Sequence, residues 1–282
     1  MMLKKIGVIG CGNMASAVVE GIYSKNQNIE FLTYTPSYTR AEALASKVKG
    51  TAVKEIKALA EADTLLIGCK PQQFLEVAKL LRESFELKDK YILSILAATS
   101  VEIHQQELGC TKVTRIMPSL PIEFNEGISL IYHSPEVEVS LKEKVNSLLT
   151  SASKVYEMKT QEEFNKVTVV SASGPAYIYY ITSLFAKALE KWNIDGQTAR
   201  EMSVQLLRGS TTVMEQKTKD SLDELVDKVT SKKGVTIEAV NTLKDQQIDK
   251  ILFQALDNAY LRSQEIEADF SKLAWVENLV EE

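Results

Sequence analysis

Short apolar runs alternate with longer amphipathic segments from the N-terminus to about Pro121, and this alternation restricts the possible folds more than any other feature. The short runs suit buried strands, and the segments between them suit helices that cross back over a sheet. Such βαβ units give parallel strands joined by right-handed crossovers. The expected strands are residues 5–9, 31–34, 64–69, 91–96 and 113–117, and the expected helices are residues 14–24, 40–49, 72–87 and 101–108. We therefore expect a doubly wound α/β sheet.

Two further strands are expected after this alternation, at residues 128–132 and 154–157. They follow the parallel units late in the chain, where antiparallel edge strands are common. A helix is expected between them, and the spacing of Ser140 and Glu143 predicts a capping box at its start.

The sequence becomes almost wholly helical near Thr160, where Thr160 and Glu163 form a second predicted capping box. We therefore expect a boundary between residues 1–160, an α/β domain, and residues 161–282, an all-helical domain. The expected helices of the second domain are residues 164–192 with a break at Gly174 and Pro175, and residues 198–217, 221–229, 236–244 and 248–279.

The stretch 167–188 is apolar on most of its faces, so a helix formed there needs cover on every side. Two arrangements provide such cover. The helix lies either at the centre of the helical domain of one chain or in an interface between subunits.

Bulk properties restrict the class of protein. A chain of 282 residues exceeds what one hydrophobic core usually serves, which fits two domains. A net charge of −5 gives no basic footprint for nucleic acid. The three cysteines are too few for a disulfide framework or a zinc site, and no stretch is long and apolar enough to cross a membrane. We therefore expect a cytoplasmic protein.

A glycine motif, GCGNMA, follows the first expected strand and opens the first expected helix. Gly10 permits a tight turn, Gly12 lets the backbone approach a diphosphate, and Ala15 lets the helix lie against the sheet. Asn13 and Met14 bring the first backbone N–H groups of the helix, which face an anion. The motif predicts a Rossmann-type domain that binds a nicotinamide dinucleotide.

The end of the second expected strand carries no carboxylate, the group that would accept hydrogen bonds from the ribose of NAD. Thr35 and Ser37 supply hydroxyls there, and Arg40 supplies a cation, which suits a 2′-phosphate. NADPH is therefore favoured, with NADH as the alternative.

Two later turns lie at carboxyl ends of expected strands, where open α/β sheets bind ligands. One contains Cys69, Lys70 and Pro71, and the other contains Ala97 and Ala98. We expect both turns to border the cofactor. A nucleophilic role for Cys69 is not favoured, because hydride chemistry needs no thiol.

In the helical half, Ser231 to Thr236 precede a helical pattern. The free N–H groups of Gly234, Val235 and Thr236 can hold a carboxylate there, and the Ser231 and Thr236 hydroxyls add donors. The residues alone favour a capped helix after an exposed lysine turn over an anion site.

Together these stretches resemble the pyrroline-5-carboxylate reductases, which reduce a cyclic imine to proline. The stretches that match in order and approximate spacing are residues 10–15 (GCGNMA), 69–71 (CKP), 97–98 (AA), 117–118 with Pro121, 173–177 (SGPAY) and 231–239 (SKKGVTIEA). The resemblance implies an α/β Rossmann domain followed by a helical dimerisation and substrate-binding domain. It also implies that Ser231, Gly234, Val235 and Thr236 hold the substrate, and that the Thr236 hydroxyl lies beside the imine nitrogen.

Two loops depart from the family pattern. Ser119 and Leu120 stand where the family usually has Asn and Thr, and Lys232, Lys233 and Val235 change the second loop. Three hypotheses follow. The chain is a pyrroline-5-carboxylate reductase, a reductase of another imino acid, or a cofactor-binding regulatory protein without turnover. His104 and His133 lie outside these motifs, and we expect them to be surface or strand-end residues.

Overall fold

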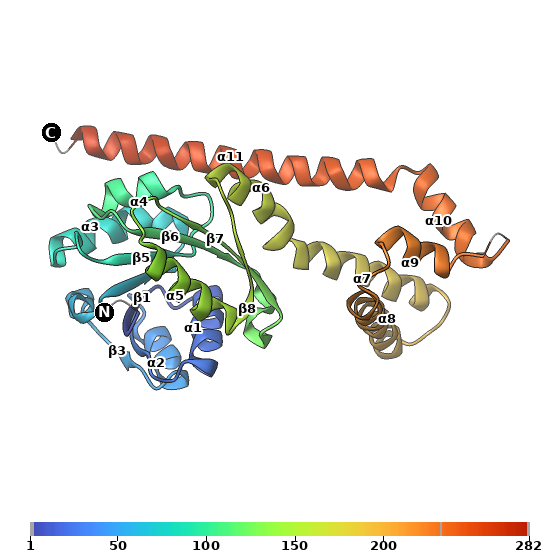
Figure 1. Ribbon diagram of the computed structural model, residues 1–282, viewed down its shortest axis with the longest axis horizontal. Coiled ribbons are helices and arrows are strands. Elements are labelled where there is room, and N and C mark those ends of the chain that lie inside the picture. Colours follow the sequence, from blue (N-terminus) through green and yellow to red (C-terminus); the bar gives the residue numbers. More distant parts are fainter. Residues whose placement is uncertain (1–2, 232, 281–282) are drawn as a thin grey trace. The chain divides into compact units, whose positions relative to one another are not determined.

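One eight-stranded sheet underlies the first part of the structure (Figure 1). The computed structural model describes residues 3–231 and 233–280. The strands run in the order β3-β2-β1-β4-β5-β6-β7-β8, and β6 and β7 are the one antiparallel pair among these described strands. Their bounds are β1 Lys5–Ile9, β2 Glu30–Tyr34, β3 Thr51–Ala52, β4 Thr64–Ile67, β5 Tyr91–Ser94, β6 Val113–Pro118, β7 Gly127–His133 and β8 Ser153–Glu157.

The predicted alternation of strands and helices is confirmed, with shorter strands than expected. β4 stops at Ile67 and β5 at Ser94, because their ladder partners end at the same level. β3 was not predicted, since two residues are too few to show a pattern. The expectation of antiparallel edge strands is half right. β7 is antiparallel to β6 but lies inside the sheet, whereas β8 is at the edge and runs parallel to β7.

Helices cover both faces of the sheet, as a doubly wound fold requires. Adjacent residues of one strand point to opposite faces, so Leu66 belongs to one hydrophobic cluster and Leu65 to another, and each cluster includes residues of the helices on its own face. Figure 1 shows these two layers. The helices are α1 Asn13–Lys25, α2 Tyr38–Lys47, α3 Phe74–Ser84, α4 Val101–Leu108, α5 Val139–Thr150 and α6 Gln161–Ser171, with short 3₁₀ helices η1 Ile56–Glu61, η2 Pro71–Gln73 and η3 Leu120–Phe124.

The two predicted capping boxes have different outcomes. The one at Ser140 is wrong, because α5 already begins at Val139 and no side chain caps it. The one at Thr160 is confirmed as an N-cap, with the Glu163 N–H donating to Thr160 Oγ1 over 3.0 Å. The Glu163 carboxylate accepts a hydrogen bond in return from the N–H of Lys159 over 2.8 Å, one residue earlier than a capping box has it.

Contacts divide the chain into two units. The first contains the residues up to Ser173 together with those from Ala259 onward, because α6 buries Phe164 against the sheet and Phe270 lies 6.1 Å from Phe74 between ring centres. The predicted domain boundary at residue 160 differs from this division by contacts and stays a prediction. The second unit, Gly174–Asn258, contains α7 Gly174–Lys191, α8 Gly196–Gln216, α9 Leu222–Lys228, α10 Val235–Asp245 and the start of α11 Ile248–Val280.

The predicted helix break at Gly174 and Pro175 is confirmed, since α6 ends at Ser171 and α7 begins at Gly174. No residue of α7 is buried in the chain. Tyr180 is 64% exposed and Leu184 46% exposed, so the helix is not the core helix of this chain. Of the two predicted arrangements, the structure therefore favours burial of this apolar helix between subunits.

The prediction for His104 is wrong, whereas His133 does end β7. His104 is fully buried in α4, where one ring nitrogen bonds Ser94 Oγ and the other bonds the carbonyl of Ser100, both over 2.6 Å. No sequence pattern indicated this burial, because it depends on the contact between His104 and Ser94, which lies on β5. Among the described residues, no helix combines the length and apolar character needed to cross a membrane.

Candidate active site

The glycine-rich turn between β1 and α1 joins the ends of three strands. Gly10 has a φ of +89°, a conformation that side chains rarely adopt, and its N–H donates to the carbonyl of Tyr34 over 2.9 Å. A Cβ on Gly10 would lie 2.6 Å from the backbone nitrogen of Cys69. The turn is therefore possible only with glycine at this position.

Gly12 leaves open space at the start of α1. A Cβ there would meet no atom within 4 Å, and Gly12 is the N-cap residue of the helix. No side chain caps α1, and its first turn, which starts with Asn13 and Met14, carries no acidic residue. Its first N–H groups are therefore available to an anion such as a diphosphate.

Ala15 and Gly68 bring the helix close to the sheet. Ala15 is 1% exposed, and a Cβ on Gly68 would lie 2.8 Å from the Ala15 side chain. The sequence reasoning assigned the role of Ala15 but missed Gly68. The signal for it was a glycine near the carboxyl end of the strand expected at residues 64–69, next in the sheet to the turn that carries the motif.

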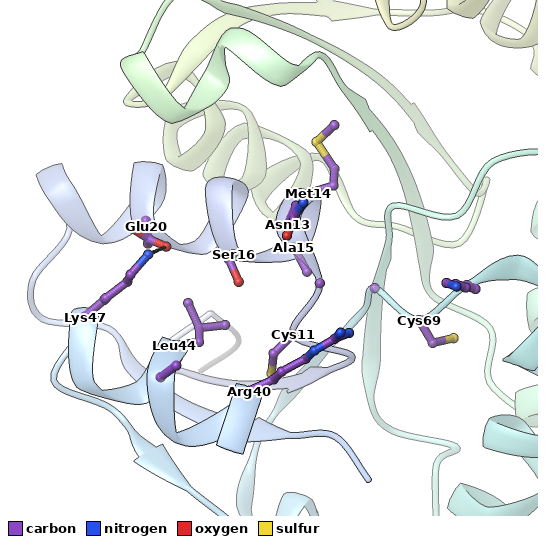
Figure 2. Close-up of a pocket in the computed structure, with 14 residues that line it drawn as sticks. Cys11, Asn13, Met14, Ala15, Ser16, Glu20, Arg40, Leu44, Lys47 and Cys69 are labelled. Atoms are coloured by element: carbon purple, nitrogen blue, oxygen red, sulfur yellow. Dashed lines mark hydrogen bonds and ion pairs between the residues drawn. The ribbon is translucent and has the colours of Figure 1, made fainter. Parts of the chain in front are cut away.

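A hollow of about 580 Å³ lies beside this turn (Figure 2). Arg40 and Lys47 from α2 and Lys70 after β4 give it a basic lining, and Lys47 forms an ion pair with Glu20 over 2.9 Å. Figure 2 shows α1 and α2 on two sides of the hollow, with Cys11 between them and Cys69 on a neighbouring segment.

A second hollow of about 400 Å³ adjoins the first and shares part of its lining. Thr35, Ser37 and Arg40 all line it, so the predicted phosphate donors lie together. Ser37 is the N-cap residue of α2, but its hydroxyl makes no capping bond. The shared residues are Cys11, Gly12, Arg40, Gly68, Cys69 and Lys70. The two hollows thus follow the carboxyl ends of β1, β2 and β4, the place where such sheets bind ligands.

The turn after β4 is built as expected for a strand-to-helix junction. Pro71 is the first residue of η2, and the exposed Lys70 precedes it as the N-cap. Burial raises the pKa of the Cys69 thiol to about 12, so it is protonated at neutral pH. This agrees with the absence of a nucleophilic role for Cys69.

A third hollow, of about 180 Å³, contains the turn after β5, and we call it the β5–β6 hollow. Ala97 and Ala98 form one side, and Ala98 has a φ of +52°. Arg115 from β6 lines the hollow and is 1% exposed. The other lining residues are Met117, Asn165, Thr168, Val169, Ser173, Ala259, Arg262, Ser263 and Ile266, all in the first unit. Sequence reasoning missed Arg115, because a single arginine flanked by apolar residues fits the pattern of an ordinary strand.

The predicted substrate loop lies in the second unit, where Gly234 is the N-cap residue of α10. The Gly234 N–H donates to the carbonyl of Ser231 over 2.9 Å, and a Cβ on Gly234 would lie 2.3 Å from Ser231 Oγ. Val235 is 91% exposed, Thr236 is exposed, and no side chain caps α10. The prediction of a free N–H on Gly234 is therefore wrong, because the turn before α10 uses it, whereas the N–H groups of Val235 and Thr236 lie in an uncapped first turn beside the exposed hydroxyls of Ser231 and Thr236. Lys232 lies outside the described residues.

The departure at Ser119 has a structural explanation. Ser119 is 3% exposed, and its hydroxyl accepts a hydrogen bond from the N–H of Ile128 over 2.8 Å. Leu120, the neighbouring departure, is 38% exposed at the start of η3. The serine thus holds the turn before β7.

Two sequence-family models match parts of the chain. One described as pyrroline-5-carboxylate reductase dimerisation matches residues 161–266, and one described as NADP oxidoreductase coenzyme F420-dependent matches residues 5–98. A pyrroline-5-carboxylate reductase of Haemophilus influenzae is 28% identical over 272 residues, covering 96% of this chain and 100% of that protein. Its counterpart in Pasteurella multocida is 29% identical over 276 residues, with the same coverage of both chains.

Solved structures show the same fold. A Plasmodium falciparum pyrroline carboxylate reductase with NADP bound aligns with a TM-score of 0.81 at 22% identity, over 95% of this chain and 100% of that chain. A 1-pyrroline-5-carboxylate reductase from Streptococcus pyogenes aligns with a TM-score of 0.82 at 24% identity, over 93% and 98%. The predicted α/β domain followed by a helical domain is thereby confirmed as the fold class.

Proposed function

Since this chain belongs to the pyrroline-5-carboxylate reductase family, we propose that it reduces 1-pyrroline-5-carboxylate to L-proline with NADPH. The observation that carries the proposal is the pair of uncapped helix starts, one at Gly12 and one at Gly234. Each offers free N–H groups to an anion, as a dinucleotide and an imino acid require.

The residues of the first unit fit the cofactor. The open space over Gly12 receives the diphosphate, because no atom lies within 4 Å of the position of a Cβ there. Ser37 and Arg40 hold the 2′-phosphate, and the two later turns, at Cys69–Pro71 and Ala97–Ala98, border the nicotinamide and its ribose. When bound, NADPH supplies the hydride from its dihydronicotinamide ring.

The residues of the second unit hold and orient the substrate. The N–H groups of Val235 and Thr236 and the hydroxyl of Ser231 bind its carboxylate, at the turn that is closed by the hydrogen bond from the Gly234 N–H to the Ser231 carbonyl. The Thr236 hydroxyl accepts a hydrogen bond from the protonated imine nitrogen. Such a bond to a charged group contributes about 1.5–3 kcal/mol. No strong acid is needed, since a cyclic imine can bind already protonated.

Two copies of the chain form the working enzyme in this proposal. α7 exposes Tyr180, Leu184 and Phe185, and α8 exposes Leu206. These apolar side chains of one copy pack against those of a second copy and form a homodimer, which buries surface that a single chain leaves in water. We place the enzyme in the cytoplasm, where its three cysteines stay reduced.

The test is oxidation of NADPH by purified protein, followed by absorbance with 1-pyrroline-5-carboxylate as substrate. Proline formation with saturation in both substrates is expected. A panel of cyclic imino acids of other ring sizes is assayed in parallel, and a clear preference for another ring would contradict the choice of substrate. Binding of NADPH without reduction of any imine would contradict the proposed activity.

Cofactor preference has its own test in Arg40→Ala. Loss of the cation at the second hollow should weaken NADPH binding and leave NADH binding nearly unchanged, because NADH has no 2′-phosphate. Titration of protein fluorescence with each nucleotide gives the two dissociation constants. An equal loss of affinity for NADPH and NADH would show that Arg40 does not bind the 2′-phosphate.

A further inference from the structure

Arg115 is a buried arginine in the middle of a sheet. It lies on β6, in register with Ser94 of β5 and Tyr132 of β7, and its side chain lines the β5–β6 hollow. Its guanidinium lies over the ring of Phe164, with the central carbon 4.4 Å from the ring centre. A fully buried arginine is rare unless its donors are paired, so each N–H of Arg115 needs an acceptor.

The acceptors within the described residues are too few. Arg115 Nη1 donates to Gln161 Oε1 over 3.4 Å, a long bond to an oxygen that already accepts from the N–H of Val101 over 2.7 Å. Nε and Nη2 have no hydrogen-bond partner in the part of the chain that the structure describes. Leaving buried donors of a charged group without acceptors is costly. A ligand that supplies an acceptor in the hollow would remove that cost.

The charge around Arg115 indicates which kind of acceptor fits. Burial lowers the pKa of Arg115 to about 10, which keeps it charged at neutral pH, and the nearby carboxylates of Glu267 and Glu102 act in the opposite direction. Arg262, the other cation of the hollow, is paired with Glu265 over 2.8 Å. The positive charge is thus already offset by carboxylates. A neutral carbonyl oxygen fits this surrounding better than a further anion does.

The position of the hollow identifies a source of that carbonyl. A dinucleotide that begins at the turn after β1 extends along the carboxyl ends of the strands, and the sheet order next gives β4 and β5. The turn after β5, with Ala97 and Ala98, forms one side of the hollow. The volume of about 180 Å³ compares with about 30 Å³ for one water in the liquid, so a small flat ring fits.

We propose that Arg115 donates hydrogen bonds to the carboxamide oxygen of the nicotinamide ring, and so fixes the orientation of the ring in the β5–β6 hollow. This rests on the proposed NADPH-dependent function. Arg115 is then a binding and positioning residue for the cofactor. Gln161 and Phe164 hold its side chain in place from α6.

The test compares the affinity of two nucleotides for the dimer carrying Arg115→Lys. Lysine keeps a cation opposite Glu102 and Glu267 but loses the planar set of donors. Calorimetric titration should give a dissociation constant for NADPH about 10-fold to 100-fold higher than that of the wild type. The constant for 2′,5′-ADP, which lacks the nicotinamide, should not change. Equal weakening of both nucleotides would overturn the proposal and indicate a structural role.

A matched control is Arg82→Lys, which alters another partly buried arginine of the same unit, one that is paired with Glu107. This variant should keep the wild-type ratio of the dissociation constants for NADPH and 2′,5′-ADP. If Arg115→Lys leaves NADPH affinity unchanged but raises the KM for the imine, the substrate is the acceptor and the inference about the cofactor fails while the proposed function stands.

A measurement on the wild-type protein covers the case in which Arg115→Lys does not fold. Thionicotinamide adenine dinucleotide phosphate replaces the carboxamide oxygen by sulfur, a weak acceptor. Its reduced form should bind at least several-fold more weakly than NADPH. Equal affinity for the two would overturn the proposal, whereas failure of the wild type to bind NADPH at all would refute the proposed function instead.

Discussion

The two glycines of the first turn have different roles, and a pair of alanine variants separates them. In Gly10→Ala the new side chain would adopt a φ of +89° and lie 2.6–2.7 Å from backbone atoms of Gly68 and Cys69. Backbone strain of this kind costs about 1–3 kcal/mol, and forced displacement of packed atoms costs about the same again. The variant should therefore lose about 2–6 kcal/mol of unfolding free energy, and its melting temperature should fall by roughly 4 to 24 °C.

Gly12→Ala should behave in the opposite way. The φ of Gly12 is −79° and no atom lies within 4 Å of the new Cβ, so the free energy of unfolding should change by less than about 1 kcal/mol. The methyl group instead occupies the space that the diphosphate needs. An overlap of that kind costs about 1–3 kcal/mol, which raises the dissociation constant of NADPH roughly 5-fold to 150-fold.

Thermal unfolding followed by circular dichroism and nucleotide titration measure these two effects separately. The reasoning is refuted if Gly12→Ala melts as early as Gly10→Ala, or if it binds NADPH as the wild type does.

Three other predictions concern the substrate, pH and assembly. Thr236→Ala should lower kcat/KM for the imine by about 10-fold to 100-fold with no change in NADPH affinity, and steady-state kinetics that match the wild type would remove Thr236 from the mechanism. Burial lowers the pKa of His104 to about 4, below the usual 6.5, so the unfolded chain binds the extra proton first. The contribution of neutral His104 to the free energy of unfolding is therefore fully present above pH 6.5 and is lost as the pH falls toward 4. A His104→Gln variant should show a smaller decline in melting temperature between these two pH values. Leu184→Glu places a charge on the exposed apolar surface of α7, so size-exclusion chromatography with light scattering should report a monomer. A dimer as in the wild type would show that α7 does not form the interface.

Local patterns made most of the fold predictable from the sequence. The helix and strand periods located nearly every element, and Gly174 with Pro175 marked the break between α6 and α7, because these signals depend on neighbouring residues. The side of the sheet on which each helix packs, and the inner position of β7, depend on contacts far apart in the chain. No short window of sequence contains them.

The candidate site divides in the same way. The helix starts at Gly12 and Gly234 were predictable, because a helix start has a local sequence signature. Arg115 was missed, since its contacts with Phe164 and Gln161 join two different elements, and Gln161 is 46 residues away in the sequence. His104 was misassigned for a similar reason, because its burial depends on Ser94 and on the packing of α4. Long-range contacts of this kind are visible only in three dimensions.

The two margins of the sheet have a consequence for how copies of the chain meet. β3 is only two residues long, and β8 presents Lys154 and Glu157 toward water. A strand that is very short, or one that carries charges, is a poor template for a strand of another molecule. Continuous pairing of sheets from copy to copy is thereby discouraged, which protects a concentrated protein from fibrous aggregation.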